Sequence, residues 1–533
     1  MTSLHSLTSY TTRFHHTLYL SPSTWLPLVL SRLLLYLISF FFFDFLIPLA
    51  AMKFHALISE FCVAKPLKNK WRNQSRRINC SKYLCFLLMF SIVLVVFLCH
   101  LFFFSIDARP SSHHHSMKKI HSLVGESSSQ DSCLGRYIYI HDLPMRFNQD
   151  LLTNCQVLTR SIDKTSMCEY VQNSGFGPQI ISSEASDLWN SNWFWTNQFM
   201  LEVIFHDRMK KYECLTNDSL VASAIFVPYY AGLDLRRYLW GFNTSMRDSS
   251  FLDLINWLKQ KPQWKTMWGK DHFLVSSRIA RDFRRKSNRK SDWGSNFRFL
   301  PESKNLSMLT IESGPWKNDI AVPYPTSFHP SSDDQVLQWQ NLMRTQNRPY
   351  LFSFAGASRT RQKNSTRKEI IRHCQSSNKL CKLLDCNSVG HECDDPLKLM
   401  NLFRSSIFCL QPPGDSLTRR STFDSILAGC IPVFFHPGSA YTQYLWYLPK
   451  NYSNYSVFIS ANDLKLGKVR IEEKLVTVSK DEVASMREEV IRLIPRIIYG
   501  DRRSGLESVE DDAFDLAIEG VLKRVDRLRG SDL

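Results

Sequence analysis

The stretch FCLQPPGDSLTRRSTFDSILAGCIPVFF, from Phe408 to Phe435, has the composition of a strand, a loop, a helix and a second strand in that order. Its apolar ends predict two strands, the Pro412–Gly414 segment predicts a loop, and Leu417–Leu427 predicts a helix. Gly429 follows the last apolar position of this helix, where a left-handed glycine commonly ends one. This order predicts neighbouring strands of a parallel α/β sheet.

Both flanks of this stretch repeat the alternation of strand and helix. The nearer segments are strand PYLFSFAG (349–356), helices Ser365–Gln375 and Pro396–Phe403, strand IFCLQP (407–412) and strand IPVFF (431–435). Further upstream lie strands RYIYIHDL (136–143), AIFVPYY (224–230), HFLVSS (272–277) and MLTIE (308–312), with helices Asn197–Lys211 and Phe251–Leu258 between them. A chain of 533 residues exceeds what one hydrophobic core usually organises. We therefore predict two doubly wound α/β domains.

A long amphipathic segment follows the second domain. Apolar side chains recur at helical spacing through Lys480–Ile494, and Pro495 ends the pattern. We expect this helix to pack back across both domains.

The overall composition limits the class of partner. An apolar fraction of 44% with 13% aromatic residues excludes a disordered chain. The net charge of +17 is collected in short clusters, such as Lys65–Lys82 and Arg278–Lys290, instead of one basic stripe. A phosphate-bearing small molecule fits this pattern as well as a polymer does, and we expect no nucleic-acid partner. Neither a GxxxxGK[ST] nor a GxGxxG motif is present in the sequence.

One apolar segment predicts a membrane anchor. Residues 83–106, YLCFLLMFSIVLVVFLCHLFFFSI, can cross about 30 Å of hydrocarbon as a helix. Seven lysines and arginines lie between Lys65 and Lys82, whereas the other flank opens with Asp107 and Arg109. The positive-inside rule then keeps residues 1–82 in the cytosol and places the rest of the chain in the lumen.

A second apolar stretch, Trp25–Ala51, is long enough to span but contains Pro27, Arg32, Asp44 and Pro48. Either it is a second, poorer span, or translation begins at Met52. In both cases the basic segment before residue 83 is cytosolic, so the lumenal placement of the folded part is unchanged.

The chain after the anchor has the features of a lumenal protein. Residues 107–132 are rich in serine and histidine and predict an exposed stem. Ten of the fourteen cysteines follow the anchor, which suggests disulfides. The cluster Cys374, Cys381, Cys386 and Cys393 lacks a CxxC pair, so disulfides are favoured over zinc there, and its three pairings stay open. Expected glycosylation sites are Asn217, Asn243, Asn305, Asn364 and Asn451.

The expected domain boundaries follow from these segments. They are a cytosolic region 1–82, a transmembrane helix 83–106, a stem 107–132, an N-terminal α/β domain 133–340, a C-terminal α/β domain 341–500 and a helical tail 501–533.

The loop and helix of the opening stretch carry the chemistry that we expect. Gly414 lets the backbone approach a ligand, and Ser416 is positioned to cap the helix. Arg419 and Arg420 place positive charge in the first turn, where the helix dipole alone favours acidic side chains, and a diphosphate bound there would explain them. Asp424, about one turn further on, can accept hydrogen bonds from ribose hydroxyls. The competing reading, in which the arginines are solvated and Asp424 only pairs with Arg420, stays open.

Several long blocks, in order, resemble the exostosin-type glycosyltransferase family, and within it the plant xyloglucan galactosyltransferase branch. Besides the opening stretch, they are YIYIHDLPMRFN (137–148), WFWTNQFMLEVIFHDRM (193–209), AIFVPYYAGLD (224–234), MWGKDHFLVSSRIARDFRR (267–285), NDIAVPYPTSFHP (318–330), LFSFAGASR (351–359) and DAFDLAIEGVLKRV (512–525). The resemblance implies a GT-B-like pair of Rossmann-type domains and an inverting transfer from a UDP-sugar. It further implies transfer of galactose from UDP-galactose to xylosyl side chains of xyloglucan in the Golgi, by a single-pass type II membrane enzyme.

The same resemblance suggests residue roles at the nucleotide. Asp424 takes the position of the family's acidic residue facing the nucleotide, usually Glu, and Arg419 and Ser421 fall where diphosphate contacts lie. Arg359, after the FAGASR turn, is a further candidate. Because helix dipole and basic side chains can neutralise the diphosphate, we expect no essential metal and no other cofactor.

Inversion also needs a general base near the acceptor hydroxyl, for which the candidates are Asp282, Asp271 and His272. Asp282 follows a strand at the edge where α/β sheets usually bind ligands, but it is equally suited to an ion pair with Arg284 or Arg285. Glu202 is a weaker candidate that we expect to pair with His206, four residues further along one helix. The candidate acceptor-stacking side chains are Trp193, Trp195, Tyr229 and Tyr230, although aromatic residues are more often part of a core.

Two alternatives stay open for the function. The donor sugar is set by a few pocket side chains that spacing does not identify, so another UDP-sugar, such as UDP-galacturonate or UDP-arabinose, is the nearest competitor. A non-catalytic, polysaccharide-binding lumenal subunit predicts damage in the segment from Pro412 to Asp424, which instead looks intact. A Golgi placement is also compatible with complexes with other Golgi glycosyltransferases.

Overall fold

The computed structural model describes residues 131–531, apart from positions 134, 162, 164, 182–191, 358–364, 378, 387–391 and 503–510. All of these residues lie in the second of the chain's two compact units, Ser127–Leu533. The predicted anchor 83–106, the stretch Trp25–Ala51 and the stem up to residue 130 lie outside the described residues. Among the residues that are described, no helix has the length and apolar character needed to cross a membrane.

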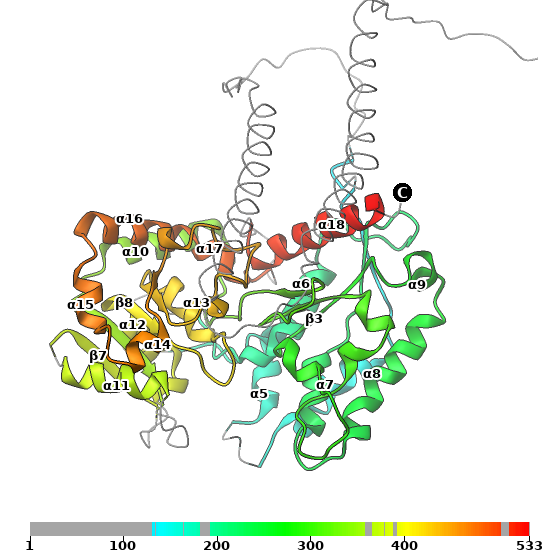
Figure 1. Cartoon of the computed structure of the whole chain (residues 1–533). Helices are drawn as coiled ribbons and strands as arrows, with labels where there is room; N and C mark the ends of the chain where they lie inside the picture. The colour runs from blue at the N-terminus through cyan, green and yellow to red at the C-terminus, as the bar shows by residue number, and fades with distance from the viewer. Residues whose placement is uncertain are drawn as a thin grey trace, which may run out of the picture. The chain divides into compact units, whose positions relative to one another are not determined.

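The first sheet has five parallel strands in the chain order β1-β2-β3-β4-β5 (Figure 1). The strands are β1 Ile138–Ile140, β2 Ala224–Phe226, β3 His272–Ser276, β4 Ser307–Thr310 and β5 Asp319–Ala321. Every residue of β3 is buried, as expected for a strand with both neighbours in a covered parallel sheet. The helices are α4 Gln149–Thr153, α5 Met167–Val171, α6 Leu201–Lys210, α7 Ala231–Tyr238, α8 Thr244–Lys259 and α9 Pro262–Met267.

The second sheet is also parallel and five-stranded, in the order β10-β9-β8-β6-β7. Its strands are β6 Tyr350–Gly356, β7 Cys381–Asp385, β8 Ser406–Gln411, β9 Ile431–Phe434 and β10 Val457–Phe458. Its helices are α10 Asp333–Thr345, α11 Thr366–Ser376, α12 Pro396–Arg404, α13 Arg420–Leu427, α14 Ala461–Lys465, α15 Ile471–Val476, α16 Lys480–Arg492 and α17 Ile494–Ile497. Because β6 lies between β7 and β8, the strand order reverses there, and open α/β sheets bind ligands at such a switch point.

Short 3-10 helices connect many of these elements. They are η2 Met145–Phe147, η3 Cys155–Leu158, η4 Asn173–Gly175, η6 Gln198–Met200, η7 Ala280–Phe283, η8 Phe297–Phe299, η9 Glu302–Lys304, η10 Glu392–Asp394, η11 Pro437–Ser439 and η12 Tyr452–Asn454.

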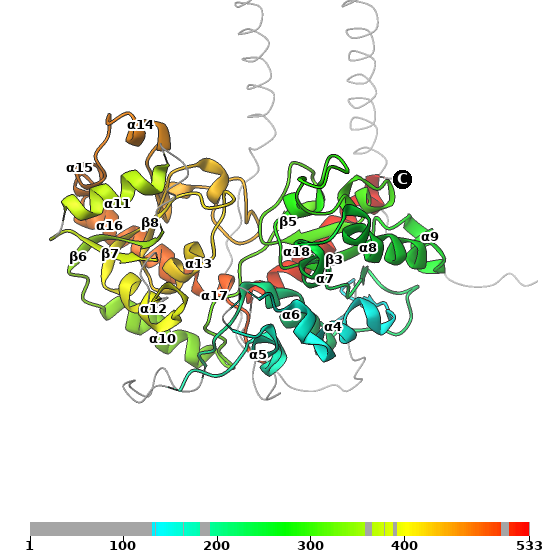
Figure 2. The same ribbon diagram turned by 90° about the horizontal axis from the view of Figure 1, so that it is seen from below.

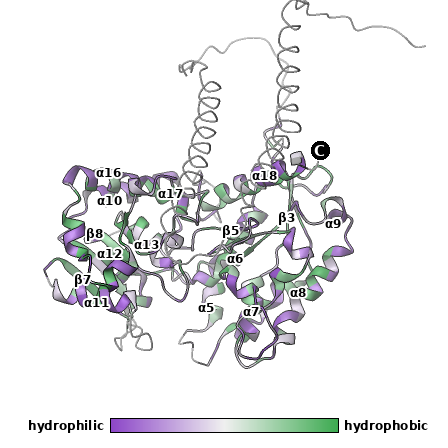
Figure 3. Ribbon diagram, in the orientation of Figure 1, coloured by the Kyte–Doolittle hydropathy of each residue, from purple (hydrophilic) through white to green (hydrophobic). Residues whose placement is uncertain are grey.

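The prediction of parallel α/β sheets is confirmed, and the apolar pattern explains why. Figure 3 shows hydrophobic residues along the central strands, whereas the helices around them carry both kinds of residue. Helix α8 is typical, since Phe251, Leu254 and Leu258 are buried on one face. Its first turn is capped by the side chain of Asn243, which accepts the N–H of Met246 at 2.9 Å.

The helix that returns to the first sheet is not the predicted one. Helix α16, within the predicted segment Lys480–Ile494, packs on α10 and α13 of the second domain. Helix α18, Ala513–Ser531, runs back to the first sheet instead (Figures 1 and 2). There Arg524 donates to the Ser307 hydroxyl at 2.9 Å and Arg529 to the Ala222 carbonyl at 3.1 Å.

All ten cysteines after the anchor form disulfides. The pairs are Cys133–Cys214, Cys155–Cys168, Cys374–Cys381, Cys386–Cys393 and Cys409–Cys430. The four clustered cysteines are therefore paired in sequence order, and the zinc alternative for that cluster is excluded because no thiolate is left to bind a metal.

Candidate active site

A cavity of about 1600 Å³ lies between the two sheets and is lined by residues that follow strands of both. Ile279 follows β3 and Ile311 follows β4, while Ala355 is the last residue but one of β6 and Gly414 follows β8. Ten basic and six acidic side chains line the wall, so the cavity is electropositive. It therefore occupies the ligand-binding edge of both sheets and suits an anionic ligand.

The loop after β8 forms the part of the wall at the switch point. The Gly414 N–H donates to the Ser416 carbonyl at 2.8 Å, which closes a tight turn. A Cβ at Gly414 would collide with the guanidinium of Arg367, which comes from the first turn of α11. On the other side, Arg419 donates to the Ala355 carbonyl at 3.0 Å and to the Pro412 carbonyl at 3.4 Å. Arg367 and Arg419 thus flank the backbone of Gly414, which has no side chain of its own.

Helix α13 begins at Arg420 with Arg419 as its N-cap, three residues later than predicted, and no side chain caps it. The predicted capping role of Ser416 is wrong, because its hydroxyl donates to the Thr418 carbonyl within the loop at 3.4 Å. The reason is a contact from the other domain. Glu312 accepts both the N–H and the hydroxyl of Thr418 at 2.8 Å, which holds this residue outside the helix. The uncapped first turn leaves the positive end of the helix dipole at the cavity, which Arg419, Arg420 and Ser421 line.

Asp424 lines the cavity from α13 but is only 5% exposed. Burial raises the pKa of Asp424 to about 6, although the positive charge of Arg420 opposes this change. The two side chains are 3.7 Å apart, so the predicted pairing exists but is loose. Arg420 is held by the other domain, since its guanidinium donates to the Thr196 carbonyl and to the Ser327 hydroxyl. The protein itself therefore compensates the charge of the Asp424 carboxylate poorly.

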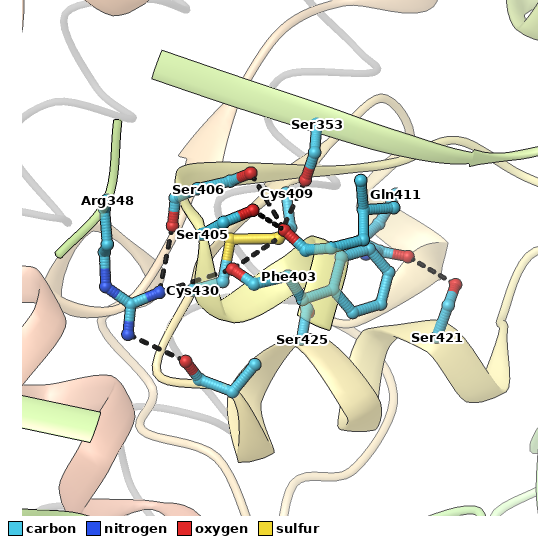
Figure 4. Close-up of a disulfide and its surroundings, with 12 residues drawn as sticks. Arg348, Ser353, Phe403, Ser405, Ser406, Cys409, Gln411, Ser421, Ser425 and Cys430 are labelled. Atoms are coloured by element: carbon cyan, nitrogen blue, oxygen red, sulfur yellow. Dashed lines mark hydrogen bonds between the residues drawn. A yellow bond between two sulfur atoms is a disulfide. The ribbon is translucent and has the colours of Figure 1, made fainter. Parts of the chain in front are cut away.

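A rigid frame supports α13 (Figure 4). The Cys409–Cys430 disulfide joins β8 to the residue before β9, and the Ser421 hydroxyl donates to the Gln411 side chain at 2.7 Å. Arg348 donates to the carbonyl of Ala428 at 2.8 Å, just after the helix. Gly429 follows with a φ of +61°, which confirms the predicted left-handed end.

Asp282 lies in η7, directly after β3, and lines the cavity. One carboxylate oxygen accepts from Arg278 at 2.8 Å and the other from the Trp293 indole N–H at 2.9 Å. The predicted ion pair with Arg284 or Arg285 is wrong. Arg284 pairs with Asp319, and Arg285 forms a buried pair with Asp248.

The other two candidate bases do not line the cavity. Asp271 and His272 lie at the start of β3, whereas the cavity residues follow its end. The His272 imidazole bonds to the Asp271 carboxylate at 2.7 Å through Nδ1 and to His141 at 3.1 Å through Nε2. Burial, together with the charges of His272 and Lys261, lowers the pKa of His141 to about 3. The cluster is part of the buried core.

Glu202 and His206 do not pair with each other, contrary to the prediction. Glu202 accepts the N–H groups of Gly232 and Leu233 in the first turn of α7. His206 bonds to the Tyr230 hydroxyl at 2.9 Å. Burial raises the pKa of Glu202 to about 7, while backbone N–H groups oppose the change. Glu202 therefore caps a helix inside the first domain.

The four candidate acceptor-stacking residues divide into two groups. Trp195 is 37% exposed and lines the cavity, whereas Trp193 touches its wall but is fully buried against Phe328 and Trp339. Tyr229 and Tyr230 lie in the core away from the cavity; the Tyr229 hydroxyl donates to Asp234 at 2.8 Å. Trp195 alone of these four is placed to meet a ligand.

The remaining predicted residues have no tested role. Asn217, Asn243 and Asn451 are exposed, while Asn305 is half-buried and donates its amide to the Trp268 carbonyl at 2.9 Å. Arg359 and Asn364 lie outside the described residues. No group of three or more His, Cys, Asp or Glu side chains within the described ranges could hold a metal ion, and metal independence stays a prediction.

The structure adds residues that sequence reasoning did not select. Arg367, Trp240 and Trp293 line the cavity but belong to segments separated from one another by more than fifty residues, and none forms part of a motif. In the sequence the cluster Arg278–Lys290 stands out only by its charge, whereas the structure brings five of its members to the cavity: Arg278, Arg281, Arg284, Arg285 and Lys286.

Comparison with known proteins agrees with this geometry. The probable xyloglucan galactosyltransferase GT15 of Arabidopsis thaliana is 55% identical over 418 residues, which cover 77% of this chain and 87% of the relative. The probable xyloglucan galactosyltransferase GT14 of the same plant is 57% identical over 75% of this chain and 76% of its own length. Xyloglucan galactosyltransferase MUR3, also from Arabidopsis thaliana, is 52% identical over 77% of this chain and 65% of its own length. The model of the Exostosin GT47 domain matches residues 132–475, which contain both sheets and the cavity, and the chain therefore belongs to the exostosin GT47 family of glycosyltransferases.

Proposed function

We propose that this enzyme transfers galactose from UDP-galactose to xylosyl side chains of xyloglucan, with inversion at the anomeric carbon. The observation that carries the proposal is the poorly compensated Asp424 carboxylate beside an uncapped helix and two arginines at a switch point. Three relatives whose names state this activity or its probable form support the choice of sugar and acceptor.

The UDP moiety occupies the second domain in this proposal. Its diphosphate lies against Gly414 between Arg367 and Arg419, at the positive end of α13. The ribose hydroxyls donate to Asp424 and so provide the compensation that Arg420 does not. Two parallel α/β domains with a cavity between them fit a GT-B-like architecture, with the donor in the second domain and the acceptor beside the first.

Asp282 is the general base in this proposal because, of the three candidates, it is the one that lines the cavity. A carboxylate has about four acceptor positions, so two hydrogen bonds leave room for an acceptor hydroxyl. Arg281, the preceding residue, donates to the Asp415 carbonyl at 3.3 Å, which places η7 next to the proposed diphosphate loop. The acceptor oxygen attacks the anomeric carbon, its proton passes to Asp282, and the sugar–phosphate bond breaks with its electrons on UDP.

Arg367, Arg419 and the α13 dipole stabilise the departing UDP anion, and for this reason we expect no essential metal. The five disulfides suit an oxidising compartment, and with the predicted anchor 83–106 they support a Golgi lumenal placement. We retain the domain boundaries at 133–340, 341–500 and 501–533 as part of the proposal, except that the whole of helix α10, Asp333–Thr345, is counted with the second domain on which it packs.

A second candidate, transfer of a uronate from UDP-galacturonate, is favoured by the ten basic side chains around the cavity. The full chain in detergent, supplied with xylosylated glucan oligosaccharides, distinguishes the two when UDP-galactose, UDP-galacturonate and UDP-arabinose are offered separately. We expect acceptor-dependent UDP release with UDP-galactose. UDP release with another donor and none with UDP-galactose would reject our choice. If none of the three donors gave UDP release, a non-catalytic subunit would be favoured.

A further inference from the structure

Two tryptophans of the first domain line the cavity near the proposed base. The Trp293 side chain is 43% exposed, and Trp240, which follows α7, is half-buried. Their rings meet edge to face with centroids 5.4 Å apart. A large indole that is left open inside a cavity commonly marks a binding surface, because burying it against a ligand releases water from apolar area.

The position of Trp293 is fixed by the loop that follows it. Gly294 has a φ of +83°, and a Cβ there would overlap the backbone carbonyl of Asp282. The Ser295 N–H donates to that same carbonyl at 2.9 Å, and the Arg285 N–H donates to Ser295 at 2.7 Å. Because Gly294 allows this close approach, the chain folds back on η7 and brings the Trp293 indole N–H to the Asp282 carboxylate.

A second set of contacts orients Trp240. The Arg160 guanidinium lies over the Trp240 ring, 3.7 Å from its centroid. Arg236, which also lines the cavity, donates to the Leu158 carbonyl at 2.8 Å and pairs with Asp163. Arg160 thus packs on a face of the Trp240 ring, and Arg236 ties α7, the helix before Trp240, to the segment that carries Leu158 and Asp163.

We propose that Trp240 and Trp293 form an acceptor subsite that stacks a neutral pyranose ring and presents one of its hydroxyls to Asp282. Trp293 has two functions there: its ring binds the acceptor, and its N–H positions the Asp282 carboxylate. The proposal rests on the proposed function above for the identity of the acceptor, a glucan oligosaccharide. The subsite is inferred because the partly exposed Trp293 ring lies beside the Asp282 carboxylate, to which the Trp293 N–H donates.

The chemistry explains why this wall suits a sugar. The C–H faces of a pyranose are apolar and pack on an aromatic ring, whereas its hydroxyls at the rim need polar partners. Trp240 and Trp293 supply the rings, while Arg160 and Asp282 supply a donor and an acceptor beside them. An anionic acceptor would have no reason to prefer the indoles over the many cavity arginines.

The test uses the full chain in detergent with UDP-galactose and xylosylated glucan oligosaccharides. We expect Trp293→Ala to raise the acceptor KM on the order of tenfold, a loss typical of an aromatic contact, while the Kd for UDP stays within about twofold. Trp240→Ala should act in the same direction. Trp268, which is 64% exposed but does not line the cavity, provides the control, and Trp268→Ala should leave both constants unchanged.

Trp293→Phe separates the two functions, because it keeps an aromatic ring and removes the N–H. The acceptor KM should stay near the native value, while kcat falls on the order of tenfold and the acidic limb of its pH profile moves to higher pH. An unchanged acceptor KM in Trp293→Ala, with native thermal unfolding, would overturn the subsite. An unchanged pH profile in Trp293→Phe would overturn the positioning role.

A failure of the proposed function is distinguishable from a failure of this inference. If the native chain transfers no galactose, the oligosaccharide is instead titrated by calorimetry against native, Trp293→Ala and Trp268→Ala protein. Loss of binding in Trp293→Ala alone supports the subsite even then, and equal binding by all three proteins refutes it.

Discussion

Replacing Asp424 by asparagine should stabilise the protein and weaken nucleotide binding at the same time. Burial raises the Asp424 pKa from 3.8 to about 6, and at about 1.4 kcal/mol per pKa unit the ionised side chain destabilises the fold by about 3 kcal/mol. An amide at this position still loses water on burial, so we expect a net gain of about 1–2 kcal/mol. In a domain of this size that gain raises Tm by about 2–8 °C.

The pH dependence of this gain follows from the sign of the pKa change. Below pH 3.8 the carboxyl is protonated in the folded and the unfolded chain, and the two proteins should differ little. Between pH 3.8 and about 6 the unfolded chain ionises first, so the advantage of Asp424→Asn grows, and above pH 6 it is constant. Thermal unfolding of both proteins between pH 4 and 8 measures this curve.

UDP binding by Asp424→Asn, measured by calorimetry, should weaken on the order of tenfold or more, because hydrogen bonds to a charged acceptor are lost. Asp512 provides the control, since it is equally buried but accepts from Arg208 and from three backbone N–H groups. Asp512→Asn should therefore lower Tm. If Asp424→Asn lowered Tm at pH 7.5 as Asp512→Asn does, or if its UDP affinity were native, the poorly compensated carboxylate would not be a ligand site.

Three further predictions concern the frame of the cavity. Gly294→Ala should destabilise the fold by more than about 3 kcal/mol in urea unfolding, because both its φ of +83° and its contact with a backbone carbonyl exclude a Cβ; a change below about 1 kcal/mol would contradict this. Cys430→Ser breaks the bond to Cys409, 21 residues away, and should lower the free energy of unfolding by about 3 kcal/mol, an effect that must disappear under reducing conditions. Burial lowers the pKa of His141 to about 3 and that of His206 to about 4, so each histidine should lower the free energy of unfolding by up to about 1.4 kcal/mol per pH unit as the pH falls below 6.5. The difference in free energy of unfolding between native protein and His141→Phe across pH 5–7 measures the effect of His141, and a pH-independent difference would refute it.

The sequence was sufficient for the parallel α/β fold because its strands are apolar runs bounded by turn residues, a signal that depends on near neighbours alone. The sequence was insufficient where contacts with residues far away along the chain set the bounds of an element. Helix α13 starts at Arg420 because Glu312, a residue of the other domain, takes the hydrogen bonds of Thr418. Strand β5 has only three residues and was not recognised as a strand.

The same distinction applies to the site. Asp424 was found because its loop and helix form one continuous stretch, and Asp282 because it follows a strand. Asp271 and His272 are candidate bases in the same stretch of sequence as Asp282, yet one strand separates them from the cavity edge. Trp293 belongs to no motif, and only the fold of the Gly294 turn shows that it meets Asp282.

The contacts between the two domains imply that the donor site depends on both of them. Glu312 and Arg281 of the first domain hold the loop before α13, and Arg420 at the start of α13 is bound by Thr196 and Ser327 of the first domain. These contacts hold the arginine at 3.7 Å from Asp424, too far for a close ion pair, and keep the first turn of α13 uncapped, the two features that we assign to nucleotide binding. Without the first domain, Arg420 would be free to neutralise Asp424 directly, as helix partners four residues apart ordinarily do. The affinity for UDP is therefore a property of the packed pair of domains, although most of the proposed contacts come from the second.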